Sequence, residues 1–143
     1  MRPALEAQVA RLGLQDRVTF LGLASDADLR HAYLAADLFC MPGTAELQSL
    51  VTLEAMSAST PVLLADAMAL PHLVRDGENG YLFTPNDSDD LAAKMVRVLS
   101  LPADELAAMG KASRGLVENH SLERTLRAFE ELYRGASYDD LVV

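Results

Sequence analysis

The sequence is poor in cysteine and has no long apolar run, and each shortage excludes a class of protein. Cys40 is the only cysteine among 143 residues, so a disulfide framework and a cysteine metal cluster are both excluded. No signal-peptide pattern opens the chain, and no apolar run approaches the ~20 residues that a membrane-spanning helix needs. We therefore expect a soluble cytoplasmic protein, or part of one, with Cys40 as a buried and inert thiol.

Basic residues are also scarce. Twelve lysines and arginines face 21 aspartates and glutamates, which gives a formal net charge of −9. A balance of this sign argues against nucleic acid or an anionic membrane as the main partner. It leaves room for a local anion pocket built from backbone N–H groups at the start of a helix.

The remaining composition is that of an ordinary globular domain. Half of the residues are hydrophobic and 23% are charged, and 143 residues are enough to enclose one core. We expect one domain over residues 1–135 and a loose tail over residues 136–143.

The stretch from Asp37 to Asp66 predicts a strand–helix–strand unit. A short apolar segment at 37–41 reads as a strand, 49–58 as a helix, and 62–65 as a second, buried strand. A unit of about thirty residues is typical of a βαβ crossover, which implies parallel strands and a right-handed connection.

Alternation of strands and helices continues on both sides of this unit. Two further strands are expected at 17–21 and 81–83. Periodicity and capping residues predict helices at 5–12, 26–36, 89–100, 103–120 and 122–135, and a helical turn at 70–74. The class is therefore α/β with a parallel sheet.

Two acids stand out within the central unit. Glu54 is the only charged residue of an otherwise apolar helix, and Glu46 stands eight residues earlier in the loop that feeds this helix. A buried carboxylate needs a partner, because an isolated charge is costly to bury. Glu54 is thus either a structural carboxylate with a buried donor or a ligand-binding group, and Glu46 is either a solvated loop acid or part of the same site.

The succession of motifs along the chain resembles a known family. The matching segments are RVTFLG, AYLAADLFCMP, the Glu-x7-Glu pair with LEAM around the second acid, TPVLLAD, LVRDGENGYLFTPNDSDDLA and HSLERTLRAFEELY. Together they resemble the C-terminal, donor-binding domain of GT-B-fold retaining glycosyltransferases of the glycosyl transferases group 1 type. The resemblance implies a Rossmann-like parallel sheet with flanking helices, as a truncated half of such an enzyme.

The resemblance also implies roles for particular residues. Glu54 would accept hydrogen bonds from the nucleotide ribose, and Glu46, the catalytic candidate, would touch the donor sugar. Backbone N–H groups at the helix start would face the sugar and the diphosphate; they belong to Gln48, Ser49, Leu50 and Val51. Hydroxyls suit a fixed carboxylate, and a helix N-terminus suits a diphosphate.

Partners and cofactors follow from the same resemblance. The donor substrate would be a nucleoside diphosphate sugar, from which a hexosyl group passes to an acceptor with retention, and neither a cofactor nor a metal is implied. An acceptor domain, or a partner chain that supplies it, is missing from these 143 residues. In the family two further strands lie between the segments that correspond to 17–21 and 37–41.

The sequence departs from the family pattern at several glycines. Leu47-Gln48-Ser49 replaces a Gly-rich turn, Ser59 replaces a glycine, and Met68-Ala69 replaces a Gly-Gly pair. Each change adds a Cβ where backbone would approach a ligand. An acid after Pro71 is replaced by His72, a candidate base or phosphate partner that is more simply a surface residue.

These departures leave alternatives open. The chain is either the donor-binding portion of a glycosyltransferase, inactive by itself, or a non-catalytic interaction module derived from one. An unrelated nucleotide-binding domain is a weaker alternative, since no Gly-rich phosphate loop follows a strand. Without the two strands that the family has between 17–21 and 37–41, the sheet has three alternatives. Segment 17–21 pairs directly with 37–41, another chain supplies the missing strands, or the sheet keeps an open edge that favours homo-oligomers.

Overall fold

The computed structural model describes residues 1–137, apart from the side chain of Asn119, so most of the expected tail lies outside the described residues. The helices are α1 (Arg2–Arg11), α2 (Asp26–Ala35), α3 (Leu50–Ser57), α4 (Ser88–Leu99), α5 (Ala103–Val117) and α6 (Leu122–Tyr133), with short 3-10 helices at Leu70–Leu73 and Glu118–His120. The strands are β1 (Phe39–Met41), β2 (Val62–Ala65) and β3 (Gly80–Phe83). No helix in this part of the chain is both long and apolar enough to cross a bilayer.

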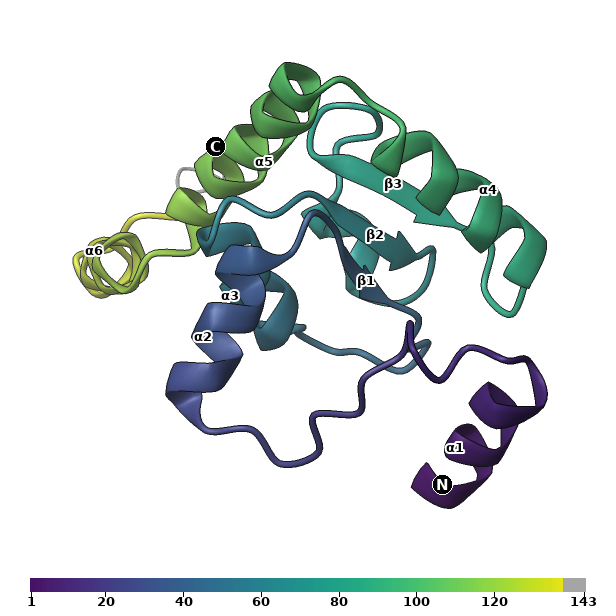
Figure 1. The fold of residues 1–143 in the computed structure, drawn as a ribbon. Helices are drawn as coiled ribbons and strands as arrows, with labels where there is room; N and C mark the ends of the chain where they lie inside the picture. Colours follow the sequence, from purple (N-terminus) through teal and green to yellow (C-terminus); the bar gives the residue numbers. More distant parts are fainter. Residues whose placement is uncertain (138–143) are drawn as a thin grey trace.

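The three strands form one parallel sheet in the order β1-β2-β3, as Figure 1 shows. Phe39 pairs with Val62, and Val62 pairs with Gly80. All four residues of β2 are buried, which is expected of a central parallel strand covered on both faces. The predicted α/β class and the βαβ unit β1–α3–β2 are confirmed.

Helices pack against the strands of the sheet and against one another. α3 contacts β1 and β2, α4 runs along β3, and α5 packs against α3 (Figure 1). The core is built from apolar side chains of these elements, among them Met56, Leu63, Leu64, Val98 and Met109. α1 and α6 lie at the periphery and contain no buried residue.

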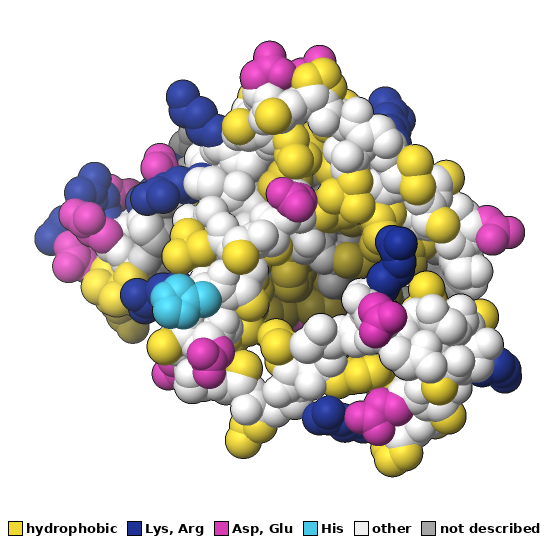
Figure 2. Space-filling view, in the orientation of Figure 1, with side chains coloured by type: hydrophobic (Ala, Val, Ile, Leu, Met, Phe, Trp, Pro, Cys, Tyr) yellow, Lys and Arg dark blue, Asp and Glu magenta, His cyan; other side chains and the backbone are white. Residues whose placement is uncertain are grey.

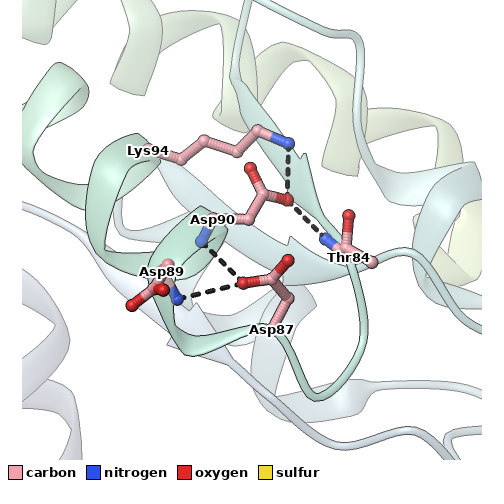
Figure 3. A network of polar contacts seen from close by, with 5 residues as sticks. All are labelled: Thr84, Asp87, Asp89, Asp90 and Lys94. Atoms are coloured by element: carbon pink, nitrogen blue, oxygen red, sulfur yellow. Dashed lines mark hydrogen bonds and ion pairs between the residues drawn. The ribbon is translucent and has the colours of Figure 1, made fainter.

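The turn from β3 into α4 is set by acidic side chains at the helix start (Figure 3). Asp87 is the N-cap, and its Oδ1 accepts hydrogen bonds from the backbone N–H groups of Asp89 and Asp90. Asp90 Oδ2 accepts from the Thr84 N–H at 2.7 Å and from Lys94 Nζ at 3.0 Å. These donors lower the pKa of Asp90, the backbone N–H of Thr84 first.

The predicted strand at 17–21 is wrong. Residues 18–22 have no regular secondary structure, and the N–H groups of Arg17 and Val18 donate to the carbonyl of Leu14 within a turn. The segment has strand-like composition, but a strand needs a neighbour for its backbone hydrogen bonds. Since β1 lies at an end of the sheet, re-pairing of this segment with β1 is excluded as well.

No residue before Ser49 is buried. The first 48 residues nevertheless carry large apolar side chains that face solvent, such as Leu21 at 64%, Leu23 at 104% and Leu34 at 64% exposure. The residues of β1 are half-buried against the core. The core of this structure therefore lies in the later two thirds of the chain.

Two of the positions where the resemblance implies glycine have the backbone conformation that glycine favours. Ser59 has φ +64° and Met68 has φ +52°, both in the left-handed region that non-glycine residues rarely adopt. We expect Ser59→Gly and Met68→Gly to stabilise the fold by about 1 kcal/mol each, because glycine relieves this strain. Urea unfolding followed by circular dichroism measures the difference.

Asn86 is the matched control. It has φ +63°, but asparagine tolerates this conformation, so Asn86→Gly should change stability by only a few tenths of a kcal/mol. A loss of stability in Ser59→Gly and Met68→Gly would contradict the strain interpretation.

Candidate functional site

Glu54 lies on α3, where it faces α2, and its side chain is exposed. The expectation of a buried charge on a core-like helix is therefore wrong. One donor does reach the carboxylate: the Tyr33 hydroxyl of α2 donates to Glu54 Oε2 at 3.2 Å. No other described side chain is hydrogen-bonded to this carboxylate. The bond fixes one oxygen of Glu54 and leaves its second oxygen for other partners.

A cavity of about 510 Å³ occupies the groove between α2 and α3. Its volume lies within the 300–1,000 Å³ that is usual for small-molecule sites. The lining residues are Asp26, Leu29, Arg30, Tyr33, Leu34, Glu54, Ser57 and Ala58. The cavity thus combines apolar side chains with two carboxylates (Asp26 and Glu54), a guanidinium, a phenol and a hydroxyl.

Tyr33 is held in place by contacts beyond Glu54. The Thr60 hydroxyl donates to the Tyr33 carbonyl at 3.0 Å, and the Tyr33 ring meets the Phe39 ring edge-to-face at 6.0 Å. Burial raises the pKa of Tyr33, and the hydrogen bond to Glu54 and its charge add to this. The sequence pattern placed Tyr33 within the predicted helix at 26–36 but did not assign it this role. The available signal was that a tyrosine hydroxyl on a packed face usually finds a partner.

The start of α3 lies outside this cavity and has its own hydrogen bonds. Ser49 is buried at 1% exposure, and its hydroxyl pairs with the Thr52 hydroxyl at 2.7 Å without capping a backbone N–H group. The Leu50 N–H donates to the Gln48 carbonyl at 3.1 Å. Leu50 and Val51 are 62% and 38% exposed, so the first turn of α3 presents an open, partly apolar surface.

Glu46 is half-buried in the loop that follows β1. Its carbonyl accepts from the Ala69 N–H at 3.3 Å, which ties this loop to the one that follows β2. Its carboxylate Oε1 lies 3.6 Å from the position that a Cβ on Gly43 would take, so the side chain folds back over Gly43. Glu46 therefore lies where the carboxyl ends of the parallel strands meet.

The structure thus places the predicted site residues in two groups. Glu54 belongs to the α2–α3 cavity, whereas Glu46 and residues 48–51 do not line that cavity. His72 is exposed, and Arg75 pairs with Glu78 at 3.9 Å on the surface. Among the described residues no three His, Cys, Asp or Glu side chains are grouped as metal ligands would be.

Comparison with known proteins identifies the same family as the sequence motifs. Residues 2–116 match the glycosyl transferases group 1 family. A D-inositol 3-phosphate glycosyltransferase of Mycobacterium avium is 38% identical over 125 residues, which are 87% of this chain and 30% of that protein. A Rhodococcus opacus protein of the same name is 36% identical over 134 residues, or 94% of this chain and 30% of that protein.

Solved structures share the fold. A sucrose-phosphate synthase from Thermosynechococcus elongatus has a TM-score of 0.83 at 34% identity, over 93% of this chain and 33% of that one. Anabaena HepE in complex with UDP-glucose has a TM-score of 0.73 at 32% identity, over 82% of this chain and 32% of that one.

Only part of each relative is represented here. The chain spans about a third of the length of the curated relatives and of these two structures. A C-terminal domain of a Francisella tularensis group 1 glycosyltransferase matches with a TM-score of 0.73 at 28% identity, over 82% of this chain and 60% of that one. The family match and the shared fold together establish that this chain belongs to the glycosyl transferases group 1 family.

Proposed function

We propose that this chain is the donor-binding portion of a glycosyltransferase that transfers a hexosyl group from a nucleoside diphosphate sugar with retention of configuration. The observation that carries the proposal is the exposed carboxylate of Glu54, held by Tyr33 at the wall of a ligand-sized cavity. The solved complex of Anabaena HepE with UDP-glucose, whose fold this chain shares, supports the choice of donor. A cytoplasmic location is part of the proposal on the sequence pattern alone.

In this proposal each part of the site has one task. The carboxylate of Glu54 accepts hydrogen bonds from two ribose hydroxyls, since charge-assisted bonds of this kind are short and strong. The N–H groups of Gln48, Ser49 and Val51 at the first turn of α3 donate to the sugar and the diphosphate, whereas the Leu50 N–H already donates to the Gln48 carbonyl. Glu46, in the loop at the carboxyl ends of the strands, contacts the donor sugar and is the catalytic candidate.

The isolated chain should not catalyse transfer. About two thirds of the matched relatives' length, which would include an acceptor-binding part, has no counterpart here. Arg30 is the only basic residue in the lining of the described cavity, and residues 48–53 at the start of α3 include no lysine or arginine, so the diphosphate would find little positive charge at either place. Donor binding by this chain should therefore be weak and transfer activity absent.

A titration of the isolated chain with UDP-glucose, followed by ¹H–¹⁵N NMR, tests the proposal. We expect millimolar affinity, about −4 kcal/mol, with resonance shifts at Tyr33 and Glu54. In Glu54→Gln the affinity should fall about tenfold, because the loss of a charged acceptor removes roughly 1.5 kcal/mol. UDP, GDP and ADP in the same titration identify the base.

Tyr33→Phe and His72→Ala serve as comparisons. Tyr33→Phe keeps the ring contact with Phe39 but frees Glu54, and we expect a smaller loss of affinity than in Glu54→Gln. His72→Ala changes an exposed residue that does not line the cavity, so binding should be unchanged if His72 is a surface residue and weaker if it is a phosphate partner. Absence of shifts at 10 mM, which is about ten times the expected constant, would contradict donor binding. A low-micromolar dissociation constant would contradict the expectation that the donor site of the isolated chain is incomplete.

A second candidate function is a non-catalytic interaction module. The observation that favours it is the apolar surface of the first 48 residues, none of which is buried. Such surface is unusual for a chain that acts alone, because exposed apolar patches generally mark an interface.

A further inference from the structure

Two oppositely charged side chains of α2 line the cavity without pairing. Asp26 and Arg30 stand four residues apart with the acid first, which is the order that favours an ion pair on a helix. Pairs of the same order elsewhere in the described residues are closed: Lys94–Asp90 at 3.0 Å, Arg134–Glu130 at 3.6 Å and Arg127–Glu123 at 4.0 Å. Within the described part of the chain, neither Asp26 nor Arg30 has an ion pair or a side-chain hydrogen bond. Both charges are therefore available to a ligand in the cavity.

The open pair lies on the same wall of the cavity as the contact between Tyr33 and Glu54. Asp26, Arg30 and Tyr33 follow one another at helical spacing, so they share one face of α2. At 1.5 Å per residue, Asp26 lies about 10 Å along the helix axis from Tyr33, which holds Glu54. A nucleoside is of similar length between its ribose hydroxyls and the hydrogen-bonding edge of its base.

Apolar side chains accompany these charges in the cavity lining. Leu29 and Leu34 contribute from α2, and Ala58 contributes from the end of α3. Figure 2 shows hydrophobic side chains and side chains of both charges next to one another on the surface over α2. Such a mixture suits a flat heterocycle, because its faces need apolar contacts and its edge needs a few well-placed polar groups.

The two charged groups specify what that edge must offer. A guanidinium only donates hydrogen bonds, and an ionised carboxylate only accepts them. Uracil and guanine fit both groups, because each has a carbonyl oxygen beside a ring N–H. Cytosine and adenine have the reverse arrangement, an amino group beside a bare ring nitrogen. Their donor would meet the guanidinium and their acceptor would meet the carboxylate.

We propose that Asp26 and Arg30 select the base of the bound nucleoside diphosphate sugar. Arg30 donates to O4 of uracil or O6 of guanine, and Asp26 accepts from the adjacent ring N–H. Cytosine and adenine are rejected, because both polar contacts would be left unmade. This assignment rests on the proposed function, since it places the ribose on Glu54 and thereby directs the base along α2.

UDP and CDP are the matched probes, because they share ribose, diphosphate and ring size and differ at the edge of the base. In ¹H–¹⁵N NMR titrations of the full chain, UDP should bind at least about tenfold more tightly than CDP. GDP should exceed ADP by a similar factor. The tighter of UDP and GDP identifies which of the two bases the cavity accepts.

Asp26→Asn is the discriminating variant. Its amide adds a donor that the bare ring nitrogen of cytosine can accept, so the preference for UDP over CDP should largely disappear. Asp37→Asn, which changes an exposed aspartate that does not line the cavity, should keep the preference. Glu54→Gln should weaken UDP and CDP by the same factor and leave their ratio unchanged. Asp26 is exposed, so its variant should fold like the wild-type chain.

The outcomes separate base selection from donor binding. Equal affinity for UDP and CDP, with shifts at Glu54, would overturn the assignment of Asp26 and Arg30 and leave the proposed function intact. A preference for UDP that persists unchanged in Asp26→Asn would also overturn the assignment. If none of the four nucleotides shifts any resonance, donor binding itself is contradicted, and base selection with it.

Discussion

Gly110→Ala should cost about 3 kcal/mol or more of folding free energy, because the added methyl group meets backbone that cannot rotate away. Gly110 lies in α5 where this helix crosses the end of α3, and an added Cβ would collide with the Ser59 carbonyl oxygen. That neighbour is backbone, so relief requires α5 to move away from the core. Urea unfolding measures the change, and a marginal fold with 5–15 kcal/mol in total would lose much of its stability.

Gly115 of the same helix is the matched control. An added Cβ at this position meets nothing within 4 Å, so Gly115→Ala should stabilise the chain by up to about 1 kcal/mol through helix propensity alone. Similar results for the two variants would show that close approach of α5 to α3 is unimportant.

Asn79→Ala should destabilise the fold by about 2–4 kcal/mol, because it leaves one buried and one partly buried backbone group without a partner. Asn79 has 0% exposure and sits in the turn before β3. Its Oδ1 accepts from the Arg75 N–H at 2.7 Å, and its Nδ2 donates to the Leu73 carbonyl at 3.0 Å. Thermal unfolding should show a Tm lower by about 10 °C.

Ser113→Ala separates this effect from a general loss of polar contacts. The Ser113 hydroxyl donates to the Asn79 carbonyl at 3.2 Å, but that carbonyl also accepts from the Val62 N–H at 3.0 Å. Removing one of two donors should cost only about 1 kcal/mol. An equal loss in both variants would contradict the assigned role of the Asn79 side chain.

Most of the secondary structure was predictable because its signals are local. The apolar run at 62–65 and the cluster of capping residues at 86–88 predicted β2 and the start of α4 within a residue or two. Segment 17–21 failed because a strand is defined by its neighbour, and no local pattern reveals that the neighbour is absent. The same reason hid the open edge of β1 until the sheet order was seen.

The candidate site was predictable only in part. The unusual charge on α3 pointed to Glu54, but spacing along one helix gave no information about α2, so Tyr33 as its partner was missed. Glu46 and Glu54 were expected in one site because the Glu-x7-Glu pair resembles the family pattern. The structure assigns the α2–α3 cavity to Glu54 alone, because contacts across helices decide which side chains meet.

The first 48 residues enclose no core, which should make them the part of this chain that proteases cleave most readily. They leave the ribosome before β2 exists, and they stay open to proteases afterwards, since local opening there costs little free energy. In the isolated 143-residue chain, proteolysis should therefore begin within the first 48 residues and not in the core.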